Sequence, residues 1–357
     1  MNMIRTLQVV QHLRPGGLEK LVLNLVRFAS SNHRVYVASL EETAASAISA
    51  WPELSAFRNQ LIFLNKPSGI HLHTAYQLRK LVKKLKITTV HSHHLGPLLY
   101  SRLALLGLKT THIHTEHDSW HLEELKQQTL TRWLLKNKHV ELVADAPTVA
   151  KELHQRLGRP ADHIINNGID CHFYCIGDQV NSRSDLALPK KKILIGCAGR
   201  LVSEKGIDTM LFALSSLPEH YHLVIAGDGE QLSNLKQLAY RLQLEHRIHW
   251  LGYCKNMRSF YRAIDVFCMP SRHEGLPLAL LEAQACGKSI VASNIGAIPD
   301  VAHPENSILI PPDDPAQLAH ALNHVLTHKV NETQTAHFIQ HVADVRTMTA
   351  AYEALAK

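Results

Sequence analysis

The chain has 357 residues and a mass of 40.1 kDa. This is larger than a domain built on a single hydrophobic core usually is, so we expect two domains of similar size. With 45% hydrophobic and 19% charged residues, it resembles an ordinary globular protein, which excludes a disordered or repetitive chain. The net charge of +7 is uneven: residues 1–170 hold 21 Lys and Arg against 13 Asp and Glu, and the remainder holds 17 against 18.

The first residues and the cysteines bear on location. Met1–Arg5 runs directly into a strand-like segment without an apolar leader, and no uncharged apolar run is long enough to span a bilayer. The six cysteines lack the paired spacing of a zinc site, which favours reduced thiols. We therefore expect a cytoplasmic protein without a structural metal.

Short apolar runs alternate with helical patterns from end to end, as in parallel βαβ construction. The predicted strands are 6–10, 34–39, 61–64, 88–91, 111–114 and 140–144, then 192–197, 223–226, 248–251, 266–269, 289–292 and 308–310. Leu18–Ala29 is the clearest helix. The pattern predicts an α/β protein with two doubly wound, Rossmann-like parallel sheets that face one another across a cleft. Ligands of such sheets bind beyond the carboxyl ends of the strands.

The alternation lapses in the polar stretch 171–190, which we predict to be a linker. It separates an N-terminal domain, 1–170, from a C-terminal domain, 191–335. The last segment, 336–357, is predicted as a helix that packs back on the N-terminal domain.

The densest positive charge has helical spacing. Leu78, Leu81, Val82 and Leu85 form an apolar face, and the cations on the other face are Arg79, Lys80, Lys83, Lys84 and Lys86. A solvated helix face is one interpretation and attraction to an anionic membrane surface is the other. Nucleic acid is disfavoured because no aromatic residues interleave with the cations.

Two loops have the residues of phosphate sites. Gly16 and Gly17 precede the first long helix, where backbone amides can approach a phosphate, although a simple turn is equally compatible. After the first strand of the second half, Arg200 and Lys205 flank a short loop and could converge on a diphosphate, unless they form surface ion pairs. Neither a GxGxxG dinucleotide fingerprint nor a GxxxxGK[ST] loop is present.

The segment Ser271–Glu282 places two carboxylates eight residues apart. Pro277 fits a first helical position, which puts Glu274 on the preceding loop and Glu282 about one turn inside the helix. Both side chains can then contact one ligand over the positive end of the helix. A turn followed by an amphipathic helix without any ligand is the alternative.

Histidines gather after two strands of the first half. His91 and His93 share one face of a strand, which permits a zinc site, but lining of a polar cleft on the acceptor side is the favoured interpretation. His117 follows the next strand and could donate hydrogen bonds to a sugar hydroxyl or a departing phosphate.

Together these motifs resemble the retaining GT-B glycosyltransferases of family four over nearly the whole chain. The matching segments, in order, are Gly16–Glu19, Thr115–Asp118, Asn167–Asp170, Gly199–Arg200 with Lys205–Gly206, Gly227–Gly229 and Glu274–Glu282. One departure occurs in Gly296–Asp300, where the family usually has a second Gly and a terminal Glu, which leaves the role of Asp300 open.

The resemblance implies roles for these residues. Arg200 and Lys205 would hold the donor diphosphate, Glu282 the ribose, and Glu274 hydroxyls of the donor sugar. The segment around Gly199 and the backbone near Gly275, Leu276 and Pro277 would line the donor pocket, while Gly16 and Gly17 would approach the phosphates and His117 the sugar. No metal or other cofactor is expected, because these cations stabilise the leaving diphosphate.

The resulting prediction is a hexosyltransferase that uses a nucleotide sugar, with UDP-sugars favoured over GDP-mannose, and a lipid-linked or cell-envelope glycan acceptor. The protein would be cytoplasmic and peripheral on the inner face of the cytoplasmic membrane. A nucleotide-sugar 2-epimerase and a non-catalytic lipid-binding scaffold on a similar fold are the alternatives.

Overall fold

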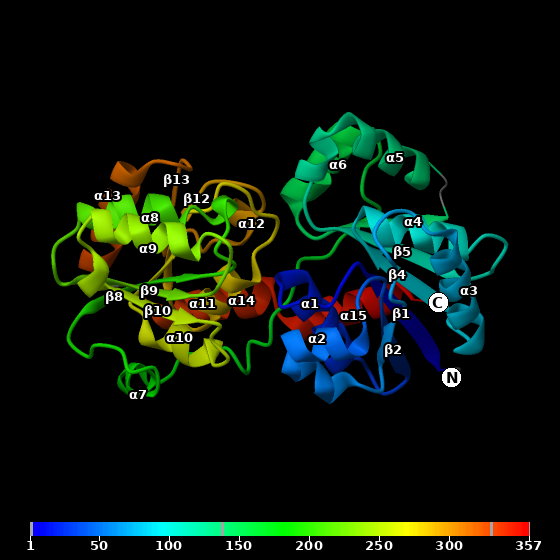
Figure 1. The fold of residues 1–357 in the computed structure, drawn as a ribbon, viewed down its shortest axis with the longest axis horizontal. Coiled ribbons are helices and arrows are strands. Elements are labelled where there is room, and N and C mark those ends of the chain that lie inside the picture. Colours follow the sequence, from blue (N-terminus) through cyan, green and yellow to red (C-terminus); the bar gives the residue numbers. More distant parts are fainter. Residues whose placement is uncertain (1–2, 137–138, 329–330, 357) are drawn as a thin grey trace. The chain divides into compact units, whose positions relative to one another are not determined.

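The computed structural model describes residues 3–136, 139–328 and 331–356, which group into two units (Figure 1). Unit 1 contains the residues up to Gly168 together with the segment from Val345 onward, and unit 2 contains Ile169–Asp344. Because the chain returns to unit 1 at its end, the C-terminal segment 336–357 is divided. Helix α14 (Glu332–Val342) belongs to unit 2 and helix α15 (Val345–Leu355) to unit 1.

Unit 1 is built on a parallel sheet in the order β3-β2-β1-β4-β5-β6-β7. Its strands are β1 Ile4–Val10, β2 His33–Ser39, β3 Leu61–Phe63, β4 Thr89–His93, β5 Thr111–Glu116, β6 Val140–Ala144 and β7 His163–Ile164. Its helices, besides α15, are α1 Gly17–Arg27, α2 Ala44–Ala50, α3 Leu72–Lys84, α4 Leu95–Ala104, α5 Leu125–Leu135 and α6 Pro147–Leu157. The six strands predicted for this half are confirmed, and the two-residue β7 was not predicted.

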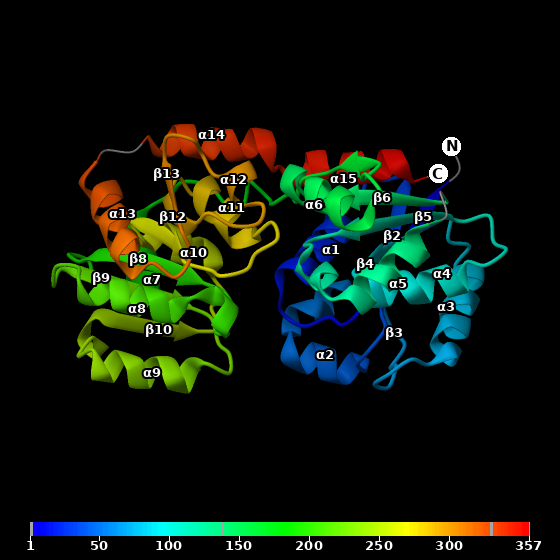
Figure 2. The same cartoon turned by 90° about the horizontal axis from the view of Figure 1, so that it is seen from above.

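Alternating side chains of the unit 1 strands bury both faces of the sheet. Leu7 and Val9 of β1 pack with residues of α3 and α4, whereas Val10 packs with α1 and α2 on the other side. Helix α15, red in Figure 2, contacts α1. Because helices cover both faces of the sheet, polar side chains can gather at the carboxyl ends of its strands.

Unit 2 repeats this plan with the order β10-β9-β8-β11-β12-β13, again all parallel. Its strands are β8 Ile193–Ala198, β9 Tyr221–Ala226, β10 Ile248–Gly252, β11 Val266–Met269, β12 Ser289–Ser293 and β13 Ser307–Ile310. Its helices, besides α14, are α7 Gln179–Asp185, α8 Ile207–Ser215, α9 Leu232–Arg241, α10 Met257–Ala263, α11 Leu278–Ala285, α12 Ile298–Val301 and α13 Pro315–Thr327. All six strands predicted for this half are present. Helices α8 and α9 lie on one side of the sheet and α7 and α10 on the other (Figure 1).

The stretch 171–190, predicted as a linker, contains α7 and belongs to unit 2. Arg183 of α7 is buried, and its guanidinium contacts Asp265 at 2.7 Å and the Ala263 carbonyl oxygen at 2.8 Å. These contacts fasten α7 to the end of α10 and the start of β11. This segment is therefore held within unit 2 by a buried arginine and does not form an extended connection.

Candidate functional site

In unit 2 the residues predicted to bind the sugar donor gather at the carboxyl ends of β8 and β11. These two strands are neighbours at the point where the strand order reverses. A pocket there is lined by Gly199, Arg200, Lys205 and Ser271 among others. Gly199 and Arg200 are exposed and follow β8 directly. The structure thus brings both predicted phosphate-binding cations to one edge of one sheet, the place where parallel α/β sheets bind ligands.

Lys205 and Glu274 form an ion pair at this edge. Lys205 Nζ lies 2.5 Å from Glu274 Oε1, and Ser271 Oγ donates to the same oxygen at 2.7 Å. The Glu274 side chain is 8% exposed and that of Lys205 is 23% exposed. The lysine charge is therefore compensated without a ligand, and an anion that binds Lys205 competes with Glu274.

Glu282 lies on α11 and is buried. Its Oε2 accepts a hydrogen bond of 2.8 Å from the hydroxyl of Tyr261 on α10. Burial, together with the charge of Glu282, raises the pKa of Tyr261 well above its usual value, so this hydroxyl stays protonated and donates. Glu274 is on the preceding loop and Glu282 one turn into the helix, as predicted. Pro277, however, is the N-cap residue, and α11 begins one residue later than expected, at Leu278.

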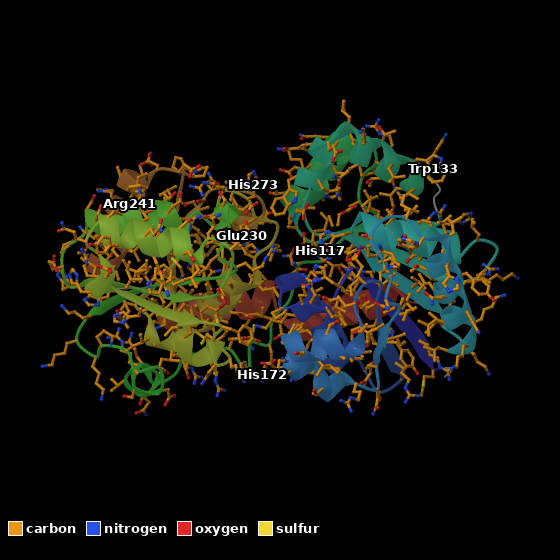
Figure 3. The ribbon with its side chains drawn as sticks, viewed as in Figure 1. His117, Trp133, His172, Glu230, Arg241 and His273 are labelled. Atoms are coloured by element: carbon orange, nitrogen blue, oxygen red, sulfur yellow. The ribbon has the colours of Figure 1, made fainter. Side chains whose placement is uncertain are left out.

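Arg272, which the sequence did not single out, joins the loop of Glu274 to the rest of the site. Its guanidinium contacts Asp208 of α8, Asp313 and the carbonyl oxygen of Ser203. Its backbone amide donates to the Glu204 carbonyl oxygen at 2.7 Å. These contacts fix the loop that holds Glu274 against the loop that holds Lys205. Its neighbour His273 is exposed (Figure 3).

Two glycines allow these loops to approach each other. Gly206 has φ +62° and a Cβ there would overlap the Pro270 carbonyl oxygen. Gly296, in the segment that departs from the family pattern, has φ +50° and a Cβ would overlap the Glu274 carbonyl oxygen. Both positions therefore require glycine for conformation and for space. Asp300 lies further along, in α12, and is partly buried.

In unit 1, Gly16 caps the N-terminus of α1 in extended conformation and Gly17 begins the helix. The Glu19 carboxylate lies against Gly16, close enough to overlap any Cβ there, and His12 Nδ1 is 3.3 Å from Glu19 Oε1. The positive end of the helix, predicted to face a phosphate, is thus already faced by a carboxylate. Glu19 belongs to the Gly16–Glu19 motif, although no role was predicted for it.

The predicted histidines lie together at the carboxyl edge of the unit 1 sheet. The ring centroids of His91 and His93 are 4.1 Å apart, and those of His93 and His117 are 5.2 Å apart. His91 Nε2 contacts Thr115 Oγ1 at 2.8 Å, and its ring packs on Tyr352 of α15. Both strand histidines are buried, at 1% and 0% exposed, so they face neighbouring side chains rather than solvent.

Both ring nitrogens of His117 have neighbours. His117 Nε2 lies 3.0 Å from His93 Nδ1, and His117 Nδ1 lies 3.3 Å from Asp145 Oδ2. Asp145, which directly follows β6, also accepts from Asn167 Nδ2 at 2.8 Å. Asp145 was not among the residues predicted from the sequence, because only the observed strand order shows that β6 lies beside β5.

A second group of charges surrounds Glu116, the last residue of β5. Burial alone would raise its pKa, but His114 Nε2 at 3.0 Å and His121 at 3.7 Å hold the pKa of Glu116 at about 2. The described residues contain no cluster of three or more His, Cys, Asp or Glu side chains arranged to hold a metal ion.

The basic helix predicted near residue 80 is α3. Leu78 and Val82 are buried in the core, as expected, while Lys80, Lys83, Lys84 and Lys86 are exposed. Arg79 is engaged within unit 1, because its guanidinium donates to the carbonyl oxygens of Ala104 and Leu106.

The exposed face of α3 also has apolar residues. Leu72 and Tyr76 are 71% and 63% exposed and precede Lys80 and Lys84 at intervals of four residues, so the four side chains share a face. Trp133 of α5, also in unit 1, is 66% exposed (Figure 3). Among the described residues, no helix combines the length and the apolar character needed to span a bilayer.

Comparison with known proteins gives consistent matches. Residues 178–341 match the glycosyl transferases group 1, and residues 15–173 match glycosyltransferase family 4. The O-antigen biosynthesis glycosyltransferase WclY of Escherichia coli is 28% identical over 300 residues, which are 80% of this chain and 79% of that protein. The lipopolysaccharide core biosynthesis mannosyltransferase LpsB of Rhizobium meliloti is 33% identical over 164 residues, 42% of this chain and 46% of that protein.

Among solved structures, Anabaena HepE in complex with UDP is similar with a TM-score of 0.85 and 22% identity, over 98% of this chain and 99% of that chain. HepE in complex with UDP-glucose is similar with a TM-score of 0.81. At this level of identity the likeness concerns the fold, and it confirms the predicted class of two parallel-sheet α/β domains.

Proposed function

Since the chain belongs to the group 1 glycosyl transferases, which have the GT-B fold, we propose that it transfers a hexose from a nucleotide sugar to a lipid-linked or cell-envelope glycan. The transfer retains the anomeric configuration and needs no metal. The observation that carries the proposal is the Lys205–Glu274 ion pair beside Arg200, at the carboxyl ends of β8 and β11. A diphosphate takes the place of Glu274 as the partner of Lys205, which frees the carboxylate to bind a sugar hydroxyl.

The proposed chemistry follows from these charges. Arg200 as a fork and Lys205 as a point charge bind the diphosphate more strongly as its negative charge grows during departure, so they stabilise the oxocarbenium-like transition state. Each charge-assisted hydrogen bond contributes about 1.5 to 3 kcal/mol. Glu282, oriented by Tyr261, binds the ribose. Glu274 orients the sugar rather than acting as nucleophile, and the leaving phosphate oxygen takes the proton of the acceptor on the same face.

A UDP-sugar is the favoured donor, with GDP-mannose as the alternative. The support comes from similar proteins: HepE was solved with UDP and with UDP-glucose, and LpsB is named as a mannosyltransferase. A thermal-shift panel of UDP, GDP, ADP and their sugars decides between them, since a ligand that binds only the folded state raises its stability by mass action.

The glycan acceptor is proposed from relatives named for O-antigen and lipopolysaccharide core synthesis. A lipid-linked acceptor places the enzyme at the cytoplasmic face of the membrane, and the exposed cations and apolar side chains of α3 fit such a surface.

Lys205→Ala tests the phosphate site directly. We expect UDP affinity, measured by calorimetry, to fall tenfold or more, from the loss of about 1.5 to 3 kcal/mol. Because the variant leaves Glu274 uncompensated, the double variant Lys205→Ala/Glu274→Gln separates loss of attraction from new repulsion. Lys236→Ala, an exposed lysine of α9, is the matched control. Unchanged UDP affinity in Lys205→Ala and in Lys205→Ala/Glu274→Gln would show that the phosphate site has been assigned to the wrong residues.

The alternatives have distinct products. Incubation with UDP-glucose alone yields an epimerised nucleotide sugar if the protein is a 2-epimerase, and binding without any turnover indicates a scaffold. With an acceptor extract, the proposal expects glycan labelling, an α-linked product from an α-linked donor by NMR, and equal rates with and without EDTA.

A further inference from the structure

The contacts of His117 belong to a longer chain of buried side chains. Gln8 Oε1 of β1 lies 2.8 Å from His93 Nε2 of β4, His93 contacts His117 after β5, and His117 contacts Asp145 after β6. The four strands are consecutive in the sheet order β1-β4-β5-β6. We call these four side chains the relay. Each of the four neighbouring strands contributes one member: Gln8 lies inside β1, and the other three lie at or directly after the ends of their strands.

Hydrogen positions follow from what each atom can do. An amide oxygen only accepts, so His93 has a proton on Nε2 and donates it to Gln8. Burial, with the nearby His91 and His117 rings, lowers the pKa of His93 well below its usual value, so His93 is neutral and its Nδ1 has no proton. His93 Nδ1 is therefore an acceptor, and His117 must donate to it through Nε2–H.

The other nitrogen of His117 faces a buried acid. Asp145 Oδ2 accepts from Asn167 Nδ2 and lies 3.3 Å from His117 Nδ1. One more proton occupies this contact, on the imidazole or on the carboxyl group, and in both placements the His117–Asp145 pair is neutral as a whole. A neutral pair suits a carboxylate that is 0% exposed, because an uncompensated buried charge is costly.

We propose that His93 and Asp145 are positioning residues that keep Nε2–H of His117 available as a donor, and that an oxygen of the nucleotide-sugar donor replaces His93 as its acceptor. His117 is 8% exposed whereas His93 and Asp145 are 0% exposed, so an arriving ligand meets His117 first. The inference rests on the proposed function only for the identity of this ligand.

Asp145→Asn tests which nitrogens of His117 are protonated, and it replaces the carboxylate with a side chain of the same size. The amide oxygen of the new side chain can replace Oδ2 and accept from Asn167 and from His117 Nδ1–H. Its nitrogen then occupies the place of Oδ1, which has no hydrogen-bond partner among the described residues. The extra proton now has no place, so a single imidazole proton is shared between Nδ1 of His117, which faces the new amide oxygen, and Nε2, which faces His93 Nδ1.

The readout is the ¹⁵N NMR spectrum of the histidine side chains in the free protein, with the His117 signals assigned from their disappearance in His117→Asn. In the wild type we expect Nε2 of His117 to be fully protonated, and in Asp145→Asn we expect its ¹⁵N signal to shift toward that of an unprotonated nitrogen. His112→Asn, at a buried histidine of β5 that contacts Ser92 outside the relay, is the control and leaves the His117 signals in place.

His93 supplies a second test through rescue. His93→Gln keeps both hydrogen bonds of the relay at this position, because one amide can donate to Gln8 and accept from His117. His93→Leu can neither donate to Gln8 nor accept from His117. We expect kcat to fall about a hundredfold in His93→Leu, at the lower end of what proton-donating groups contribute, and His93→Gln to recover most of it.

Unchanged His117 signals in Asp145→Asn, or equal kcat in His93→Leu and the wild type, would overturn the proposal. If the NMR signals move as expected but the wild type transfers no sugar from any nucleotide donor, the relay stands and the proposed function is rejected.

Discussion

Arg272 and Asp208 form a two-point ion pair in unit 2, with Nη1–Oδ1 and Nη2–Oδ2 separations of 3.0 and 2.8 Å. Arg272 Nε also contacts Asp313 Oδ1 at 2.7 Å. Hydrogen bonding to Asp208 is the main cause that raises the pKa of Arg272 further above its usual value. The pair joins the loop after β11 to the first turn of α8, and so holds Glu274 within reach of Lys205.

Arg272→Lys should therefore weaken donor binding although Arg272 is not itself assigned to the donor. A lysine has one point of attachment and cannot reproduce the fork that binds Asp208 and Asp313 together. We expect UDP affinity, measured by calorimetry, to fall about threefold to tenfold, because the pair is partly exposed and each such contact contributes about 1 kcal/mol or less. Arg241→Lys, on the exposed side of α9, is the matched control (Figure 3). Equal UDP affinities of Arg272→Lys and Arg241→Lys would contradict the positioning role of Arg272.

Tyr261→Phe removes the hydroxyl that donates to Glu282 and leaves a buried carboxylate with one donor fewer. We expect the free energy of unfolding, from urea titration, to fall by about 1 to 3 kcal/mol. Tyr221→Phe is the control, since its hydroxyl bonds a neutral amide, Asn323, at 3.1 Å, and should cost about 1 kcal/mol. The prediction fails if Tyr221→Phe is as costly as Tyr261→Phe.

Gly296→Ala separates two effects of a side chain at this position. The residue has φ +50°, and the added methyl group also overlaps the Glu274 carbonyl oxygen. Gly252→Ala, at φ +61° with open space around it, shows the conformational cost alone, about 1 to 2 kcal/mol. We expect Gly296→Ala to lose more stability than this and also to lose UDP affinity, because the Glu274 loop must move. Similar thermal shifts and intact affinity would contradict the role of Gly296.

Much of the fold could be predicted because parallel strands that are buried on both faces appear in the sequence as short apolar runs, as in Leu223–Ala226. The exception, His163–Ile164, is too short to show any pattern. Contacts between side chains of the candidate site could be predicted only where the residues are close in the sequence. Glu274 and Glu282 belong to one segment, whereas Arg272 meets Asp208 and Asp313 at sequence separations of 64 and 41 residues.

The histidines show the same limit. Spacing placed His91 and His93 on one face of a strand, and their ring centroids are indeed 4.1 Å apart. It could not show that they are buried, because burial depends on α15, whose Tyr352 packs on His91 from the far end of the chain. Asp145 likewise has meaning only after the strand order places β6 beside β5.

Buried neutral histidines should make unit 1 sensitive to acid. Burial is the main cause that lowers the pKa of His112 well below its usual 6.5, so the unfolded chain binds a proton below pH 6.5 that the folded chain refuses. Falling pH therefore favours unfolding, by about 1.4 kcal/mol for each pKa unit of the shift. We expect the free energy of unfolding to decline more gently between pH 6.5 and 5 in His112→Asn than in the wild type. His172→Asn, at an exposed position, controls for loss of one imidazole (Figure 3); identical slopes in all three proteins would contradict the prediction.

The exposed face of α3 should bind anionic vesicles both through its lysines and through its apolar side chains. Replacing Lys80, Lys83 and Lys84 with Ala removes about 1 kcal/mol per cation, so flotation with anionic liposomes should show affinity lowered about a hundredfold, with weaker dependence on salt. Leu72→Ser/Tyr76→Ser should instead lower affinity while leaving the salt dependence in place, because these side chains contribute apolar burial. The matched control replaces three exposed lysines outside α3, namely Lys151, Lys236 and Lys255. If that control loses as much affinity as the α3 variant, attraction depends on net charge alone and α3 is not the membrane-binding surface.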